Sequence, residues 1–316
     1  MTTPQDVTQA LQRTVLVANQ KGGVGKTSVV TAVAGLAARP ERRVLVVDAD
    51  PQGNATSSDL GVEGDRGRSL VTALQYGDAP QVITDVRPGL DLVAGGPYLA
   101  QVGAITATAS QTGTDVLANL RRALGEVCSQ GGYTLVLIDS GPGDAPLLDA
   151  LLGTVRYMIV PTRDDDASLS GVELLAGRYL RARQQGALVT LLGVVLFDSN
   201  PRATARNREV LADVDALLEG SGAAAFGTMI RSDRASAMDL RNAHVTPAEL
   251  VEVIGAQNRD RLAWLSGGKH RRLDTGDTEG TRLWSRDPSA LATDYQELTR
   301  EVLSRIAAVE RSGSPA

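Results

Sequence analysis

The sequence predicts an α/β fold, in which a mostly parallel central sheet carries helices on both faces. Short β-branched runs alternate with segments of helical periodicity, as parallel sheets with crossover helices require. Aromatic residues make up only 3% of the 316 residues while 42% are apolar, so the core must consist of small aliphatic side chains. The expected strands are Thr14 to Ala18, Arg43 to Val47, Thr134 to Ile138, Tyr157 to Val160, Val189 to Leu196 and a short one from Ala224 to Ile230.

The chain is expected to comprise a short leader, residues 1–12, and a single domain, residues 13–316. Within that domain, residues 247–287 are interpreted as an insertion or variable region, with a helix from Pro247 to Leu265 followed by an exposed loop. Apolar residues at helical spacing then predict a C-terminal helix over residues 288–311 that packs back on the domain.

Composition excludes several classes of protein. The single cysteine, Cys128, allows neither an internal disulfide nor a cysteine-bound metal cluster. No run of about 18 apolar residues occurs, and the N-terminus lacks the charged start and apolar core of a signal peptide. Cytoplasm is therefore the expected compartment. Because the net charge is −5, binding of nucleic acid would need a local basic patch.

A glycine-rich loop lies between the first expected strand and a helix from Thr27 to Ala38. It reads Lys21-Gly22-Gly23-Val24-Gly25-Lys26-Thr27 and is followed by Ser28. Glycines let backbone N–H groups converge on phosphate oxygens, and a helix N-terminus adds positive potential. This strand–loop–helix context is typical of a P-loop, in which Lys26 would contact the β- and γ-phosphates and the Thr27 hydroxyl would ligate Mg²⁺. Outside such a context, the same residues would form an ordinary solvated turn.

Carboxylates follow two further strands. Asp48 and Asp50 end the strand that begins near Arg43, and Asp139 follows four aliphatic residues in the form of a Walker B motif. Ligands of parallel sheets bind at the carboxyl ends of the strands, so these side chains are expected to meet the P-loop there. Asp139 would hold Mg²⁺ directly or through water. A turn that caps a helix is an alternative reading of Asp48 to Asp50, compatible with the first.

The loop resembles the deviant Walker A motif of the ParA/MinD superfamily, because Gln20 replaces the first glycine of the general P-loop pattern and a lysine opens the loop. The resemblance to the ParA partition family covers roughly residues 12–245 and the tail helix. It implies a P-loop NTPase-like fold that hydrolyses ATP with Mg²⁺. It also implies that Lys21 reaches the nucleotide of the partner subunit in a face-to-face homodimer, where such a cation would act like an arginine finger.

The resemblance also assigns roles to the carboxylates. It implies that Asp48 belongs to the Mg²⁺ environment, with Thr27 and Asp139, and that Asp50 positions the attacking water. Lys21, Lys26 and Asp50 are therefore the expected catalytic residues, and residues 21–28 the expected nucleotide-binding segment.

Two segments depart from the family pattern and a third follows it. Gly141 stands at the first of two usual prolines, leaving Pro142, and Ile230-Arg231-Ser232 replaces the common Ile-Pro-Arg. The segment from Val160 to Gly171 resembles the family's dimer face. Its three aspartates, at 164–166, are interpreted as a solvated loop or as charges at a helix N-terminus, in preference to a second metal site.

Among proteins with this ATP site, a nitrogenase-type iron protein is excluded because it needs several cysteines. A membrane-bound MinD-like protein should end in a basic amphipathic helix, whereas the tail here carries Glu297, Glu301 and Glu310. No membrane is therefore expected as a partner.

A ParA-like protein is implied to bind DNA non-specifically through arginines of its ATP-bound dimer. The alternative is that these side chains are solvated, or paired with nearby acids such as Glu209 and Asp233. The basic stretch from Lys269 to Arg272 is a second candidate surface. The candidate DNA-binding residues are Arg202, Arg206, Arg208, Arg231, Arg234 and Arg241.

The implied function is a dimerising switch ATPase on the nucleoid. It would position or segregate a DNA cargo (a plasmid, phage or chromosome) with a ParB-like adaptor that stimulates hydrolysis. Three alternatives stay open: the same ATPase moving a protein cargo, a metabolic P-loop enzyme, and a transcriptional regulator. Lys21 and the Asp48-Ala49-Asp50 motif argue against the metabolic enzyme. A 12-residue leader is too short for the helix-turn-helix that a regulator of this kind would carry.

Overall fold

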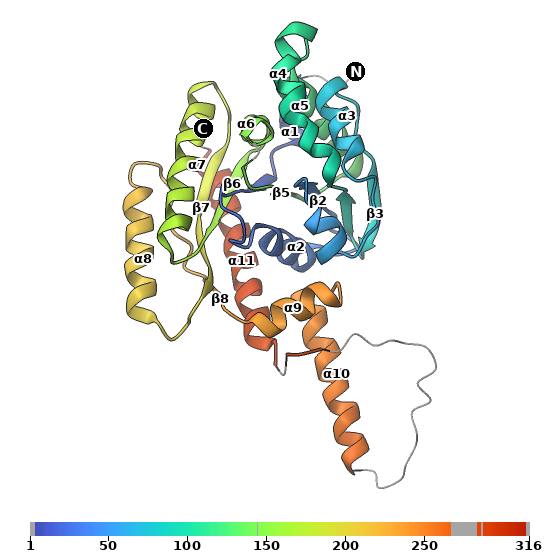
Figure 1. The fold of residues 1–316 in the computed structure, drawn as a ribbon, viewed down its shortest axis with the longest axis vertical. Coiled ribbons are helices and arrows are strands. Elements are labelled where there is room, and N and C mark those ends of the chain that lie inside the picture. Colours follow the sequence, from blue (N-terminus) through green and yellow to red (C-terminus); the bar gives the residue numbers. More distant parts are fainter. Residues whose placement is uncertain (1–3, 144, 267–282, 286, 314–316) are drawn as a thin grey trace.

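The computed structural model describes residues 4–143, 145–266, 283–285 and 287–313. Its centre is one eight-stranded sheet in the order β3-β4-β2-β5-β1-β6-β7-β8 (Figure 1). Every neighbouring pair is parallel except β3 and β4. This confirms the predicted α/β fold. The strands are β1 Thr14–Val17, β2 Val44–Ala49, β3 Val82–Arg87, β4 Leu90–Val93, β5 Leu135–Ser140, β6 Tyr157–Thr162, β7 Thr190–Ser199 and β8 Ile230–Arg231.

Helices cover both faces of this sheet. Successive side chains of each central strand point to opposite faces and so pack in different hydrophobic layers. Leu16 and Leu45 pack on one side with α3, α5, α6 and α7, whereas Val15 and Val44 pack on the other with α2 and α11. The helices are α1 Pro4–Ala10, α2 Lys26–Ala37, η1 Ala55–Asp59, α3 Arg68–Tyr76, η2 Pro97–Gln101, α4 Val102–Thr112, α5 Val116–Gly131, α6 Ala145–Thr154, α7 Asp166–Gln184, α8 Thr204–Leu217, α9 Arg234–Asn242, α10 Pro247–Ser266 and α11 Ser289–Ser312.

The antiparallel hairpin at the sheet edge, β3 and β4, was not among the expected strands. Its β3 strand breaks the usual alternation because Asp85 has a φ of 53° and the register shifts between Ile83 and Arg87. Both features remove the period-two pattern by which strands are recognised.

The expected strand from Ala224 to Ile230 is shorter in the structure, where β8 begins only at Ile230. In the part of this segment that is not a strand, side-chain acceptors take the place of hydrogen bonds to a neighbouring strand. The backbone N–H of Ala225 donates to Asp215, and those of Gly227 and Thr228 donate to Glu301. Acceptors from α8 and α11 therefore satisfy amides that a longer strand would have paired.

Both ends of the described chain pack on the domain. Helix α1 contacts α5, with Leu11 buried beside it. Helix α11 lies against α2, and its apolar stripe from Leu291 to Ile306 is buried. Helix α10 projects from the body beyond α9 (Figure 1), and the basic stretch from Lys269 to Arg272 lies outside the described residues. Within the described part of the chain, no helix is both long and apolar enough to cross a membrane.

Candidate nucleotide site

The loop between β1 and α2 has a backbone that glycine permits and other residues resist. Gly23 and Gly25 have φ angles of 75° and 90°, in the left-handed region that favours glycine. Gly25 directly precedes α2, and a Cβ there would lie 2.4 Å from the ring of Phe197. The predicted phosphate loop therefore ends in a tight turn at a helix N-terminus, where the helix dipole favours an anion.

Lys26 is buried at the first position of α2, and its Nζ donates to the backbone oxygen of Lys21 at 2.9 Å. Burial lowers the pKa of Lys26, while the charges of Asp139 and Asp50 act in the opposite direction. The ammonium is thus already aimed at the loop, in a position where the negative charge of a phosphate would favour its protonated form.

Asp48 and Asp139 lie on neighbouring strands, β2 and β5, whose register places them opposite each other. Both are fully buried. Burial raises the pKa of Asp48 to about 6, although it accepts hydrogen bonds from Thr56. Burial, followed by the charge of Asp48, raises the pKa of Asp139 well above its ordinary value, while Thr27 and Lys26 act in the opposite direction.

Among the described residues, neither carboxylate oxygen of Asp139 has a hydrogen-bond partner. Such orphaned oxygens are costly in a protein interior. A hard divalent cation bound by carboxylate and hydroxyl oxygens would satisfy them. Thr27, Asp48 and Asp139 therefore form a donor set that suits Mg²⁺.

Asp50 is nearly buried at the end of the same strand as Asp48, and its Oδ1 accepts the backbone N–H of Gln52 at 2.8 Å. A Cβ at position 141 would lie 3.0 Å from this oxygen. Gly141, which replaces the family's first proline, thus leaves room for the Asp50 carboxylate. The structure brings Asp48, Asp50, Asp139 and Lys26 into one electrostatically coupled group.

Thr56 and Gly95 support this group, and sequence reasoning missed both. The Thr56 hydroxyl donates to Asp48 Oδ2 at 2.7 Å and accepts the backbone N–H of Gly95 at 3.0 Å. A Cβ on Gly95 would lie 2.4 Å from the carboxyl carbon of Asp48. The one available signal was the glycine pair 95–96 soon after β4, since glycine often marks a close approach of backbone.

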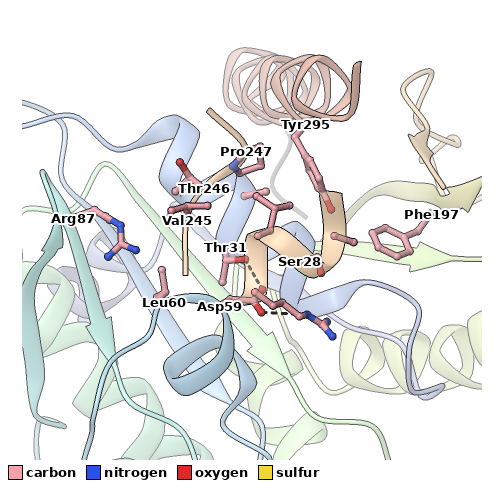
Figure 2. A pocket seen from close by; sticks show the side chains of 14 residues that line it. Ser28, Thr31, Asp59, Leu60, Arg87, Phe197, Val245, Thr246, Pro247 and Tyr295 are labelled. Carbon is pink, nitrogen blue, oxygen red and sulfur yellow. Dashed lines mark hydrogen bonds and ion pairs between the residues drawn. The ribbon is translucent and has the colours of Figure 1, made fainter. Parts of the chain in front are cut away.

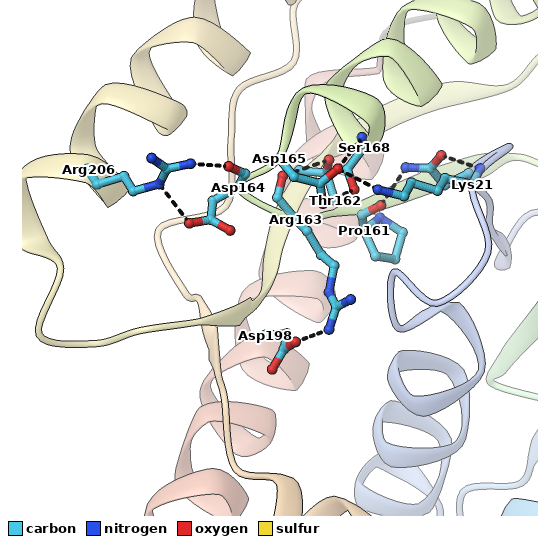
Figure 3. A network of polar contacts seen from close by, with 10 residues as sticks. Lys21, Pro161, Thr162, Arg163, Asp164, Asp165, Ser168, Asp198 and Arg206 are labelled. Atoms are coloured by element: carbon cyan, nitrogen blue, oxygen red, sulfur yellow. Dashed lines mark hydrogen bonds and ion pairs between the residues drawn. The ribbon is translucent and has the colours of Figure 1, made fainter.

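Lys21 pairs with another residue of the same chain in this structure. Its Nζ donates to Asp165, whose other contacts cap α7 by accepting from the backbone and hydroxyl of Ser168 (Figure 3). The backbone N–H of Lys21 donates to the side chain of Asn19, which in turn donates to Pro161. Lys21 therefore stands at the rim of the site, with 32% of its side chain exposed.

The aspartates at 164–166 begin α7 as the helix-terminus interpretation expected, because Asp165 is its N-cap. Asp164 forms an ion pair with Arg206. In the described parts of the chain, no group of three His, Cys, Asp or Glu side chains is placed to hold a metal ion.

Of the six candidate DNA-binding arginines, three are engaged within the subunit. The Arg231 guanidinium makes two hydrogen bonds to Asp294, Arg206 pairs with Asp164, and Arg241 Nε lies 3.5 Å from Asp59 Oδ1. The other three are exposed and, in the described part of the structure, form no ion pair: Arg202, Arg208 and Arg234.

Arg241 lines a pocket beside α2, although 57% of its side chain is exposed. Asp59, its partner, also accepts the hydroxyl of Thr31 at 2.9 Å, and the two residues lie together at the pocket wall (Figure 2). Burial raises the pKa of Asp59, and the charge of Arg241 acts against it. Arg241 therefore compensates a buried carboxylate.

A second cavity, of about 390 Å³, opens directly from the loop. Gly23, Gly25 and Ser28 line its inner end. Its other walls come from β7, β8, α9, α11 and the residue after β6, through side chains that include Arg163, Phe197, Asp198, Arg231, Arg234 and Tyr295.

Comparisons with known proteins agree with this geometry. A family model described as an AAA domain matches residues 12–186. The chromosome-partitioning ATPase Soj of Thermus thermophilus is 38% identical over 191 residues, which cover 58% of this chain and 71% of Soj. The chromosome partitioning protein ParA of Caulobacter vibrioides is 33% identical over 210 residues, covering 65% of this chain and 76% of ParA.

Two solved structures share the fold. Cobyrinic acid a,c-diamide synthase from Mycobacterium smegmatis, with a bound ATP analogue and magnesium, has a TM-score of 0.64 at 24% identity, covering 96% of this chain and 97% of the synthase. The pNOB8 ParA bound to nonspecific DNA has a TM-score of 0.58 at 17% identity, covering 94% of this chain and 99% of that ParA. The deviant loop, the three carboxylates at strand ends and the partition relatives agree, and this chain belongs to the ParA family of partition ATPases.

Proposed function

We propose that this protein is an ATP-driven switch in which MgATP joins two subunits and the joint surface binds DNA without sequence preference. The observation that carries the proposal is the position of Lys21. It opens the phosphate loop but stands at its rim, partly exposed and paired with a surface carboxylate. A cation so placed can exchange Asp165 for a nucleotide on a facing subunit, which links dimerisation to ATP.

The residues of the site divide the work of hydrolysis. Lys26 binds the β- and γ-phosphates, while Thr27, Asp48 and Asp139 hold Mg²⁺, which when bound neutralises phosphate charge. Asp50 orients the attacking water, a task that requires position more than basicity. Lys21 of the facing subunit adds charge stabilisation to the transferring phosphoryl group.

The cavity of about 390 Å³ beside the loop is the proposed seat of the base and ribose. It is continuous with Gly25 and Ser28, so a nucleotide whose phosphates occupy the loop has its base there. Ring stacking on Phe197 and contacts to Tyr295 would then replace the missing proline after Ile230.

The exposed arginines Arg202, Arg208 and Arg234 form the proposed DNA surface of the isolated subunit, and a dimer doubles it. Two similarities support DNA as the partner: Soj is a chromosome-partitioning ATPase, and pNOB8 ParA is known bound to nonspecific DNA. We propose that a ParB-like adaptor on a DNA cargo stimulates hydrolysis, which dissolves the dimer and releases DNA.

The test is binding of a labelled duplex of arbitrary sequence with MgATP, MgADP and no nucleotide, each at several salt concentrations. Tight binding should occur only with MgATP. Three arginines per subunit give at least six phosphate contacts per dimer, so log K should fall with log salt with a slope of about −5 or steeper. Nucleotide-independent or sequence-specific binding would contradict the proposal.

Because the synthase from Mycobacterium smegmatis shares the fold, a metabolic activity needs its own control. ATP turnover should yield only ADP and phosphate and should rise with added DNA and adaptor. Turnover that depends on a small acceptor molecule and yields a modified product would favour the metabolic enzyme.

A further inference from the structure

Three consecutive residues between β6 and α7 pair with three different elements of the subunit. Arg163 pairs with Asp198 near the end of β7, Asp164 with Arg206 on α8, and Asp165 with Lys21 in the phosphate loop (Figure 3). We call residues 163–165 the latch segment. It connects the lysine expected to act on a partner's nucleotide with an arginine expected to bind DNA.

At one end, Asp165 competes with the nucleotide for Lys21. Its Oδ1 accepts from Lys21 Nζ and from the backbone N–H of Ser168, and its Oδ2 accepts the Ser168 hydroxyl at 2.8 Å. The hydrogen bond from Lys21 lowers the pKa of Asp165, so the carboxylate is ionised at neutral pH. The charge of Lys21 is therefore neutralised by Asp165 of the same subunit while that subunit is monomeric.

In the middle of the segment, Asp164 competes with phosphate for Arg206. Arg206 Nε donates to the Asp164 carboxylate at 2.8 Å and Nη2 donates to the Asp164 backbone oxygen at 2.7 Å. The planar fork that would grip a phosphate is thus occupied on two sides. Because one acceptor is a backbone oxygen, this grip depends on the conformation of the latch segment and not only on a side-chain rotamer.

The first residue of the segment, Arg163, lines the proposed nucleotide cavity. Arg163 and its partner Asp198 both line the cavity of about 390 Å³ beside the phosphate loop. A nucleotide in that cavity therefore meets the latch segment directly, at the residue that precedes the two competing aspartates.

We propose that the latch segment holds Lys21 and Arg206 in cis, so that release of Lys21 to a partner's nucleotide and release of Arg206 to DNA favour each other. The proposal rests on the proposed function, since it requires a nucleotide in trans and DNA as ligands. Three ion pairs fix the conformation of the same short segment. Loss of one pair therefore makes the segment less ordered and weakens the other two pairs. Linkage then makes the effect reciprocal: DNA favours the dimer as the dimer favours DNA.

The first experiment measures DNA affinity by fluorescence anisotropy for Asp164→Asn in MgADP and in MgATP. Glu209→Gln is the matched control, because it removes the same charge from the helix that carries Arg206 without being the partner of Arg206. In MgADP, Asp164→Asn should bind DNA about two- to five-fold more tightly than Glu209→Gln, the range of one exposed ion pair. This gain in DNA affinity should vanish when Arg206→Ala is also present, and it should be smaller in MgATP than in MgADP.

The second experiment measures dimerisation by sedimentation as MgATP is raised, for Asp165→Asn. Asparagine keeps the N-cap of α7 and loses the charge on Lys21. Asp115→Asn is the control, since Asp115 is the N-cap of α5 and has no contact with the phosphate loop. Asp165→Asn should dimerise at about two- to five-fold lower MgATP than wild type, and Asp115→Asn at the wild-type concentration.

The outcomes separate the latch from the function on which it rests. Wild-type protein that binds no DNA in any nucleotide state sinks the proposed function and the latch with it. ATP-dependent DNA binding by the wild type leaves the proposed function standing. In that case, Asp164→Asn behaving like Glu209→Gln, a gain that persists with Arg206→Ala, or Asp165→Asn dimerising like wild type would each overturn the latch.

Discussion

Asp48 and Asp139 lie side by side on two neighbouring parallel strands, with both residues fully removed from solvent. Asp48 is held by Thr56, whereas the oxygens of Asp139 find no donor among the described residues. Two adjacent buried carboxylates oppose each other's ionisation. In the absence of a cation this edge of the sheet therefore costs folding free energy.

A pH dependence of stability follows from Asp48. Its pKa is raised from 3.8 to about 6 in the folded state, so the folded protein binds more protons than the unfolded chain between these values. The contribution of Asp48 to the free energy of unfolding therefore falls as pH rises through about 4 to 6, by up to about 3 kcal/mol. In EDTA, Asp48→Asn should gain stability relative to wild type across this window, measured by thermal melts. Parallel curves for the two proteins would contradict this.

Asp139→Asn should separate stability from ligand binding. Removing a buried, unpartnered charge should raise the melting temperature without ligand by about 2–6 °C at pH 8. The same change removes a proposed Mg²⁺ ligand, so the additional stabilisation by MgATP over ATP in EDTA should disappear. A variant that loses stability without ligand yet keeps the magnesium-dependent shift would show that Asp139 is structural.

Thr56 is a positioning residue for Asp48, because its hydroxyl bridges Asp48 and the backbone of Gly95. Thr56→Val keeps the shape and loses the hydroxyl, and should lower kcat or raise the Mg²⁺ requirement about 10- to 100-fold, the usual range for groups that orient metal ligands. Thr56→Ser should restore both. Equal impairment of the valine and serine variants would indicate loss of packing instead.

Lys21 and Asp50 should separate dimerisation from turnover. Lys21→Ala should bind ATP but fail to dimerise with it, as seen by light scattering. Asp50→Ala should dimerise and bind DNA with ATP while its turnover falls at least 100-fold, because Lys21, Lys26 and the proposed Mg²⁺ ligands remain and water positioning is lost. Dimerisation of Lys21→Ala at wild-type concentrations, or normal hydrolysis by Asp50→Ala, would remove that residue from the proposed role.

Two neighbouring arginines should behave differently. Arg231 makes two hydrogen bonds to the largely buried Asp294, so Arg231→Ala should destabilise the fold by about 1–3 kcal/mol. Arg234 is exposed, so Arg234→Ala should change stability by less than about 0.5 kcal/mol. It should instead weaken DNA binding and reduce the salt slope by about 2 per dimer, one for each lost contact. Urea unfolding and anisotropy titrations measure the two effects.

The sequence by itself determined the fold class and the phosphate-site motifs. Asp48, Asp50 and Asp139 stand at the ends of strands, and Lys26 and Thr27 follow the loop after β1; in a parallel sheet such positions converge on one edge. Two things therefore predict that these residues lie close together: the local sequence pattern, and the rule that ligands bind at the carboxyl ends of parallel strands. The amphipathic stripe of α11 could be read in the same local way.

Only the tertiary structure decided which partners these residues have. Thr56 contacts Gly95, Lys21 contacts Asp165 and Arg231 contacts Asp294, and the two residues of each pair lie far apart in the sequence. Spacing along a sequence carries no information on such contacts, because they depend on how helices and loops pack around the finished sheet. For the same reason, the sequence could not distinguish among the six candidate arginines. In the structure, three of them pair with carboxylates of the same chain.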